Sequence, residues 1–198
     1  MLTLFFNILM GIPSLLIKPE KEITRISLNN FPHSKVVQYY LLPVLILHIL
    51  ISLTDMLLAG YSPLSYSIHS IELLFYLLVQ PLSVVYAASV LIRSLSRMFE
   101  GSAEYGKTVT IVTLGIIPFL LGRTFTIIDP RYYYVELAGI YGMIIIWKAA
   151  RILLQIKESK KVAFILLSAI IITGLDYIFS KLMELIVFMM NLIISYYN

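Results

Sequence analysis

Five apolar stretches, each close to the length that a helix needs to cross a bilayer, dominate this chain. They cover Val36–Leu57, Ile71–Ile92, Val109–Ile128, Tyr132–Leu154 and Val162–Phe179. A hydrocarbon core about 30 Å thick takes about 20 residues of helix, and no open sheet or irregular chain satisfies its backbone polar groups there. The sequence therefore predicts an all-α, polytopic membrane helix bundle with about five transmembrane helices.

Composition and motifs argue against an enzyme. Of the 198 residues, 60% are hydrophobic and none is cysteine, which excludes disulfides, thiolate metal sites and cysteine nucleophiles. The spans leave no room for a soluble catalytic domain. The three histidines form no H-E-x-x-H arrangement, and neither a glycine-rich phosphate loop nor G-x-S-x-G occurs. We therefore expect a non-enzymatic protein without a cofactor or a bound metal.

The basic residues indicate how the chain is oriented. All but three of the 15 Lys and Arg residues lie before the first span or in the second and fourth connections, and the exceptions are Arg123, Arg131 and Lys181. Connections rich in Lys and Arg stay on the cytoplasmic side of a membrane. We therefore expect the N-terminus in the cytoplasm and the end of the fifth span on the far side, in the cell (inner) membrane if the protein is prokaryotic.

The net charge of +4 belongs to these connections, so it indicates contact with anionic lipid rather than with nucleic acid. Membrane lipids are accordingly the first partners that the sequence predicts. The candidate lipid contacts at the inner surface are Lys18, Lys21, Arg25, Arg93, Arg97, Lys157, Lys160 and Lys161.

Both ends of the chain are apolar but differ from the central spans. Residues Leu2–Ile17 are broken by Gly11 and Pro13 and lack a cationic start, so we predict an interfacial helix within an N-terminal segment, residues 1–35, rather than a signal peptide. After the five-helix domain, residues 36–180, apolar character continues over residues 181–198. That stretch is an extension of the fifth span, a surface helix or a short sixth span, and we favour the extension.

Polar residues inside the predicted spans are candidates for a functional site, because such residues are unfavourable in lipid. His48, Ser52 and Asp55 follow at spacings of four and three, so they share one face of a helix. His48 lies near mid-membrane, and a histidine changes charge near neutral pH, as a proton carrier must. The structural alternative is that His48 bonds a neighbouring helix while Asp55 reaches water at the rim.

A second polar group falls on the outer side of the predicted topology: Glu72, Arg123, Asp129, Arg131, Glu136 and Asp176. An unpaired guanidinium is unfavourable at that depth, so we expect Arg123 to pair with Asp176 or Glu136. The structural alternative is that these charges pin helices together. The two groups supply a candidate polar cavity for transport, formed by His48, Ser52, Asp55, Arg123, Glu136 and Asp176.

Other span residues shape the helices. Pro81 and Pro118 remove backbone hydrogen bonds and predict kinks. The small-residue steps Ser83-x-x-x-Ala87 and Ala138-x-x-x-Gly142 allow close approach of helices. No clear internal repeat supports the inverted-repeat design of many secondary transporters.

Several segments follow a known pattern. Ile17–Ile26 places a proline and charged residues between a short apolar helix and an amphipathic turn, and Pro43 stands at the start of the first span. The glycine-containing loop Phe99–Lys107 leads into a span with a proline, and a basic loop precedes the last span. From about Leu15 to Asp176 the chain thus resembles the Yip1 domain family of small five-span membrane proteins, in particular its compact prokaryotic members.

The resemblance implies a function through contacts rather than catalysis, since the family offers no catalytic residues to carry over. The eukaryotic members of the family are implied in vesicle trafficking, and they contact small GTPases through a long cytoplasmic N-terminal region. In this chain only about 35 residues precede the first predicted span. We therefore predict an adaptor, organiser or subunit that contacts lipids, a membrane-protein partner or a second copy of itself. The alternative is a small oligomeric transporter or channel with an outward-facing polar cavity.

Overall fold

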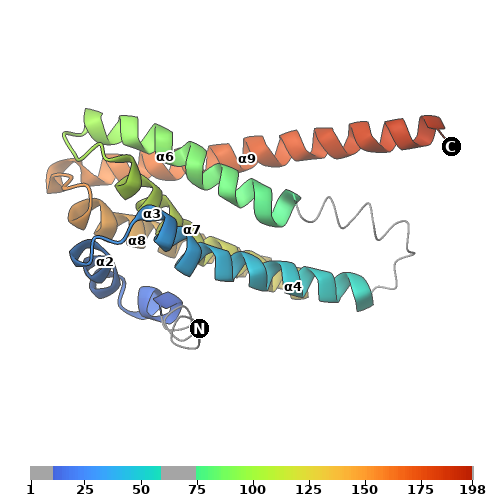
Figure 1. Ribbon diagram of the computed structural model, residues 1–198, viewed down its shortest axis with the longest axis horizontal. Helices are drawn as coiled ribbons and strands as arrows, with labels where there is room; N and C mark the ends of the chain where they lie inside the picture. The colour runs from blue at the N-terminus through green and yellow to red at the C-terminus, as the bar shows by residue number, and fades with distance from the viewer. Residues whose placement is uncertain (1–10, 59–74, 198) are drawn as a thin grey trace.

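The computed structural model describes residues 11–58 and 75–197, and within these ranges every regular element is a helix, which confirms the predicted all-α class. Residues 11–17 are helical, and the helices lie lengthwise beside one another as a bundle (Figure 1). The further elements, in chain order, are α2 (Pro19–Leu28), α3 (His33–Val36), η1 (Val37–Leu41), α4 (Leu42–Leu58), η2 (Phe75–Val79), α6 (Gln80–Met98), α7 (Tyr105–Ile128), η3 (Pro130–Leu137), α8 (Ala138–Ile152) and α9 (Glu158–Tyr197).

Four continuous helical stretches in the described residues are long and apolar enough to cross a bilayer. They coincide with the first, second, third and fifth predicted spans, although residues 71–74 of the second prediction lie outside the described residues. A helical membrane bundle is therefore the architecture of this chain. The four stretches are His33–Asp55, Phe75–Met98, Tyr105–Ile128 and Glu158–Met189.

The fourth predicted span, Tyr132–Leu154, is built from two pieces. The eight residues of η3 form 3-10 turns, and α8 adds 15 residues of α-helix. Pro130 opens η3, and the Asp129 side chain caps it by accepting a hydrogen bond from the Arg131 N–H at 2.9 Å. Tyr132 departs from helical geometry and kinks η3, and both pieces pack against α7.

Prolines inside the spans have different local consequences. The π-helical turns η1 and η2 end two residues before Pro43 and Pro81 respectively. A proline lacks the N–H that an α-helix needs, and a π turn accommodates that loss. In contrast, α7 remains one α-helix through the buried Pro118. The sequence predicted irregularity at Pro81 but did not reveal the π turns.

Helix α7 is at the centre of the bundle. Every residue from Thr108 to Pro118 is buried, and the helix contacts α4, α6, η3 and α8. At its crossing with α8, a Cβ added to Gly142 would collide with the Gly115 carbonyl oxygen. Gly142 therefore lets the two backbones touch, and a Cβ on Gly115 would collide with the Ile146 side chain. The predicted Ala138-x-x-x-Gly142 step thus lies at a helix contact.

Helix α9 is unbroken over 40 residues, or about 60 Å. Its first part lies beside α6 (Figure 1). The residues after Phe179 continue the fifth predicted span as helix, which is the arrangement that we favoured for the C-terminal residues. The domain boundaries near residues 35 and 181 remain predictions.

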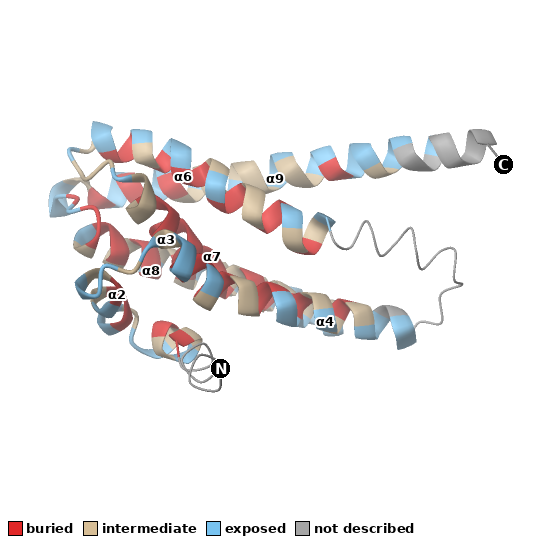
Figure 2. Ribbon diagram, viewed as in Figure 1, coloured by how far each residue is buried: buried red, intermediate tan, exposed pale blue. Residues whose placement is uncertain are grey.

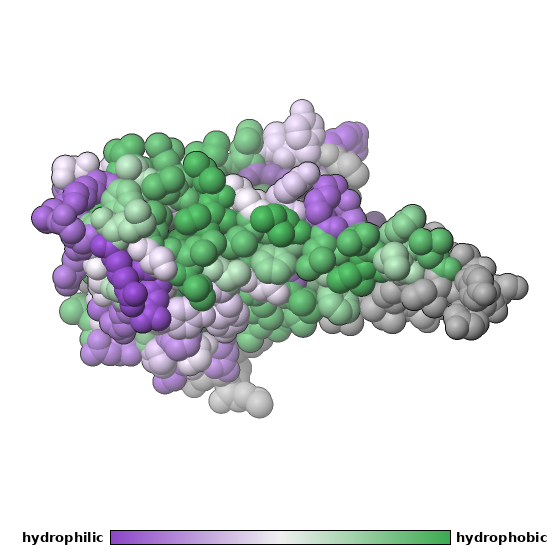
Figure 3. Space-filling view, turned by 90° about the horizontal axis from the view of Figure 1, so that it is seen from above, coloured by the Kyte–Doolittle hydropathy of each residue, from purple (hydrophilic) through white to green (hydrophobic). Residues whose placement is uncertain are grey.

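The two ends of the bundle differ in polarity and burial. Hydrophilic residues gather at the end formed by α2, α3 and the loops after α6 and α8, and hydrophobic residues cover the middle of the surface (Figure 3). Buried residues lie between the helices toward this end and become sparse along the C-terminal part of α9 (Figure 2). We call this hydrophilic end, residues 18–35, 93–107 and 148–161, the basic end, and the opposite half the far half.

Candidate functional site

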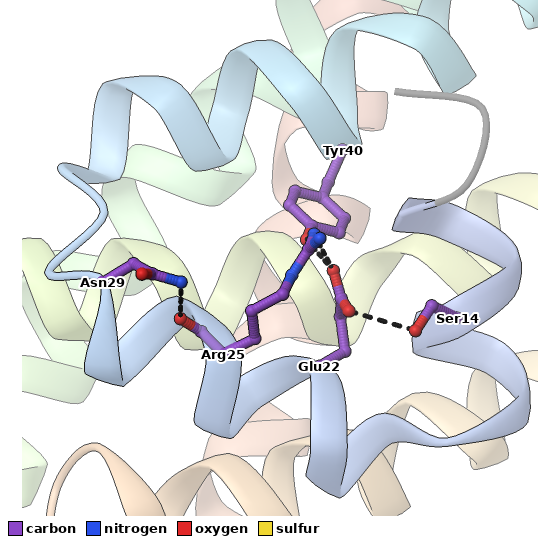
Figure 4. Close-up of polar contacts among 5 residues, drawn as sticks. All are labelled: Ser14, Glu22, Arg25, Asn29 and Tyr40. Atoms are coloured by element: carbon purple, nitrogen blue, oxygen red, sulfur yellow. Dashed lines mark hydrogen bonds and ion pairs between the residues drawn. The ribbon is translucent and has the colours of Figure 1, made fainter. Parts of the chain in front are cut away.

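The main polar cluster of the basic end joins α2 to η1 (Figure 4). Glu22 is only 3% exposed, and its carboxylate accepts hydrogen bonds from Arg25 at 2.5 Å, from Ser14 at 3.0 Å and from the Tyr40 hydroxyl. Arg25 also donates to the Tyr40 oxygen at 3.1 Å. We call Ser14, Glu22, Arg25 and Tyr40 the α2 clamp.

The apolar face of α2 explains why this carboxylate is buried. Ile23 and Ile26 are buried where α2 packs against α8, and Glu22 lies on the same side of the helix. A buried carboxylate needs donors around it, which Arg25 and Tyr40 supply. The Tyr141 hydroxyl on α8 adds a hydrogen bond to the Leu16 carbonyl at 2.7 Å. The first helices are thus held against both the first span and α8.

Sequence reasoning placed only one member of the α2 clamp in a functional role. Arg25 was predicted to contact lipid, whereas its guanidinium bonds Glu22 and Tyr40, although 47% of the side chain remains exposed. The spacing of Glu22 and Arg25, three residues apart on a helix, was the signal that could have indicated their pairing. The contact with Tyr40 depends on the tertiary fold.

Ion pairs tie the loops of the basic end together. Lys157 and Lys160, from the loop after α8 and the start of α9, donate to the Glu100 carboxylate at 2.7 and 2.5 Å. These hydrogen bonds lower the pKa of Glu100 to about 2. Lys148 on α8 likewise bonds Glu20 on α2 at 2.9 Å and lowers the pKa of that carboxyl. The three basic regions, although far apart in sequence, therefore form one connected end.

Some of the predicted lipid contacts are available at this surface. Lys18 and Lys21 are exposed and, with Lys148, line a surface hollow of about 820 Å³ over α2. Arg97 is exposed at the end of α6. The exposed side chains belong to the basic end, and their contact with lipid headgroups remains a prediction.

The remaining predicted contacts have partners within the chain. Arg93 donates to the Ala103 carbonyl at 2.8 Å, and Lys157 and Lys160 bond Glu100 as described. Lys161 is only 1% exposed, lies 4.9 Å from the centre of the Trp147 ring and bonds Glu158 at 2.6 Å. The structure thus places Lys161 inside the bundle, because the first turn of α9 directs this side chain toward α8.

The predicted polar stripe of the first span faces α7 over part of its length. His48 is buried, and its Nδ1 lies 2.8 Å from the Thr124 hydroxyl oxygen. Since that hydroxyl donates to the Leu120 carbonyl, His48 Nδ1 is the donor to Thr124. Ser52 is also buried, and its hydroxyl has no hydrogen-bond partner among the described residues. Asp55 is exposed beside a shallow hollow of about 350 Å³.

In the far half, Asp176 bonds α6 rather than Arg123. Gln80 is buried and donates from Nε2 to Asp176 Oδ1 and to the Ser180 hydroxyl, both at 2.8 Å. Within the described residues, no ion pair joins Arg123 to Asp176 or Glu136, so the structure forms neither of the expected pairs. The reason is that α9 packs against α6, which brings Gln80 to this carboxylate.

The rest of the predicted outer group lies apart from this contact. Asp129 and Arg131 pair with each other at 2.5 Å at the start of η3. This contact and the hydrogen bond to the Arg131 N–H lower the pKa of the Asp129 carboxyl. Glu72 lies outside the described residues.

A cavity of about 480 Å³ lies between α7, α8 and α9, in the far half. We call it the lateral cavity. Glu136 and Asp176 line it, and the other four residues of the predicted polar cavity do not. The predicted residues therefore do not form one cavity: His48 lies at the α4–α7 contact, Asp55 on the surface of α4, and Glu136 and Asp176 in the lateral cavity. Arg123 is half-buried on α7. Across residues 11–58 and 75–197, no three His, Cys, Asp or Glu side chains form a group that could hold a metal ion.

Comparison with known proteins gives one match. The family model of the Yip1 domain matches residues 14–179. The matched range contains the whole α2 clamp and all of the residues that line the lateral cavity except Ser180. No curated protein and no solved structure matches the chain.

Proposed function

The chain belongs to the Yip1 domain family, and from this membership we propose that it is a non-enzymatic organiser or subunit of a membrane assembly. The family is associated with membrane trafficking rather than with an enzymatic reaction. In this proposal the basic end contacts anionic headgroups and a membrane-protein partner or second copy. The long apolar helices hold that end at the surface of the bilayer.

The observation that carries this proposal is the α2 clamp. An amphipathic helix attached by a flexible segment would present its charges in many positions. Here the bond of Glu22 with Tyr40 fixes α2, while Lys18 and Lys21 remain exposed. Each basic side chain near an anionic leaflet contributes about 1 kcal/mol of attraction. A fixed basic surface at headgroup height is therefore suited to ordered contacts with lipid or a partner.

Orientation is part of the proposal, with the basic end in the cytoplasm according to the distribution of Lys and Arg. The chain contains no cysteine, so single cysteines introduced as Lys21→Cys and Tyr133→Cys can be labelled with a membrane-impermeant maleimide. We expect Tyr133→Cys to react in intact cells and Lys21→Cys to react only after permeabilisation. The reverse pattern would contradict the orientation.

Function is tested by gentle extraction of the full chain and mass spectrometry of what co-purifies. We expect a membrane-protein partner in fixed ratio, and its loss from the charge-reversed double variant Lys18→Glu/Lys21→Glu. Lys181→Glu, which changes the same charge in the far half, is the matched control and should retain the partner. A partner that co-purifies equally with the double variant and with Lys181→Glu would argue that the basic surface is not its binding site. If no partner co-purifies, the protein is not a subunit of a stable assembly.

A second candidate function is a small oligomeric transporter, which is favoured by the unpaired buried hydroxyl of Ser52 beside His48. Reconstituted protein would then show proton-linked flux, and His48→Leu would abolish it. Flux with the same pH dependence in His48→Leu would exclude His48 as the proton carrier. A folded wild-type protein without flux would exclude the transporter.

A further inference from the structure

The lateral cavity has the size and position of a ligand site. Its volume of about 480 Å³ falls within the range of about 300–1,000 Å³ typical of small-molecule pockets. Ile140 on α8 and Tyr177 on α9 are both exposed and stand at its edge. The cavity therefore opens on the apolar surface that the bundle presents to lipid.

Small residues create this space. Gly115 and Gly142 bring α7 and α8 into backbone contact, whereas α9 packs more extensively on α6 than on α8. Gly139 on α8 and Ala169 on α9 add little side-chain volume to the gap that remains. The cavity is thus a consequence of how three helices are spaced, and a larger side chain on α9 would fill it.

The depth of the cavity matches one leaflet of a bilayer. Along α9, Ala169 lies about 12 Å and Ser180 about 28 Å beyond Lys161, the last residue of the basic end. The cavity therefore extends from about the middle of a 30 Å hydrocarbon core to its far edge. An acyl chain of the far leaflet spans the same depth.

The polar side of the cavity carries two carboxylates and no basic residue. Gln80 donates to Oδ1 of Asp176. Asp176 Oδ2 and the Glu136 carboxylate receive no side-chain hydrogen bond from the described residues. Carboxylates at the edge of the hydrocarbon core are stabilised by a cation or by hydrogen-bond donors. A ligand that stabilises these two carboxylates would therefore carry a positively charged hydrogen-bond donor at the level of the lipid headgroups.

We propose that the lateral cavity binds one aminophospholipid from the far leaflet. An acyl chain lies along Gly139, Met143 and Ala169, and the primary ammonium group bonds Glu136 and Asp176. An ammonium supplies both charge and three N–H donors, whereas a choline group has charge without a donor and a glycerol group has donors without charge. This site is separate from the basic end, so it goes beyond the proposed function and can fail without affecting it.

The test uses the full chain in nanodiscs with equal amounts of phosphatidylethanolamine, phosphatidylcholine and phosphatidylglycerol. Native mass spectrometry then counts the lipids that remain bound to each chain. We expect one retained phosphatidylethanolamine, preferred about tenfold over the other two lipids, as one charge-assisted hydrogen bond would give. The double variant Glu136→Gln/Asp176→Asn should retain the three lipids about equally.

A variant that fills the cavity provides a second, independent test of the lipid site. Ala169→Phe fills the middle of the cavity and should abolish retention of the lipid. Its matched control is Ile170→Phe, at the neighbouring residue of α9 whose side chain is 64% exposed, and this variant should behave as the wild type. If the double variant Glu136→Gln/Asp176→Asn loses its helicity and does not fold, the comparison of Ala169→Phe with Ile170→Phe still tests whether lipid binds in the lateral cavity.

Three outcomes would overturn the proposal. Equal retention of the three lipids by the wild type would mean that lipid binds without recognition of its headgroup. Unchanged retention by Ala169→Phe would place the bound lipid elsewhere on the bundle. A stable dimer that carries no lipid would assign the cavity to a helix of a second copy.

Discussion

Two carboxylates of the basic end, Glu22 and Glu100, have more side-chain hydrogen-bond donors than the two carboxylates of the lateral cavity in the far half. In the basic end, Glu22 is buried among three side-chain donors, and Glu100 lies between two lysines. In the far half, Asp176 has one side-chain donor, Gln80, and Glu136 has none among the described residues. Contacts within the chain therefore fix the shape of the basic end, whereas the lateral cavity of the far half keeps carboxylate oxygens without a side-chain donor among the described residues.

The largest effect is expected at the glycine contact of α7 and α8, on which the shape of both regions depends. Gly142→Ala places a Cβ against the Gly115 carbonyl oxygen and should destabilise the fold by about 3 kcal/mol, as overpacking does. Thermal unfolding in detergent measures the loss. Gly174→Ala is the matched control, because a Cβ there meets nothing within 4 Å. Equal melting of the two variants would refute the close contact.

Glu22→Ala should have the next largest effect, because it leaves Arg25 and Tyr40 without their shared acceptor. We expect a loss of about 2 kcal/mol and faster hydrogen exchange of the amides in α2. Glu20→Ala is the control, since Glu20 forms an exposed pair with Lys148. Slow exchange of α2 in Glu22→Ala would show that apolar packing on α8 suffices to hold this helix.

Gln80→Leu tests the far half in the same way. It removes the donor to Asp176 and Ser180, and we expect a loss of about 1 kcal/mol. Val79→Leu, a change at an exposed neighbouring position, is the control. A loss as large as that of Glu22→Ala would remove the difference that we draw between the two regions.

The smallest effect concerns pH and the exposed Glu100. Because its pKa is lowered to about 2 from an ordinary value near 4.5, its pairing with Lys157 and Lys160 stabilises the fold fully above pH 4.5. That contribution is lost as the pH falls toward 2. The protection of amides in the loop after α6, measured as hydrogen exchange relative to the intrinsic rate at each pH, should therefore be insensitive to this group between pH 7 and 5 and decrease on acidification. Glu100→Gln should remove the dependence, and Glu104→Gln should retain it.

Apolar length and glycine spacing made much of this fold predictable. Residues 109–128 form a helix because they are predominantly apolar over the length of a span. Gly142 lies at a helix contact because small-residue steps favour one. The match to the Yip1 domain confirms the family resemblance that the loops and prolines indicated. Each of these features is local in sequence, so a single chain suffices to recognise it.

Contacts between distant residues were harder to predict. Glu22 is buried because α2 folds back on α8, and its partner Tyr40 follows 18 positions later. Asp176 was expected to meet Arg123, but the packing of α9 on α6 brings Gln80 to it instead. The type of a residue in a span shows that it needs a hydrogen-bond partner, whereas the packing of the helices determines which residue becomes that partner.

The unusual length of α9 has a consequence for the membrane itself. At about 60 Å the helix is twice as long as a hydrocarbon core is thick. Exposed apolar residues such as Leu185 and Phe188 extend the apolar surface of this helix toward its C-terminus. Such hydrophobic mismatch is relieved by tilt or by local thickening of the bilayer, at a fraction of a kcal/mol per Å. The protein should therefore partition toward thicker membrane regions and locally thicken thin ones.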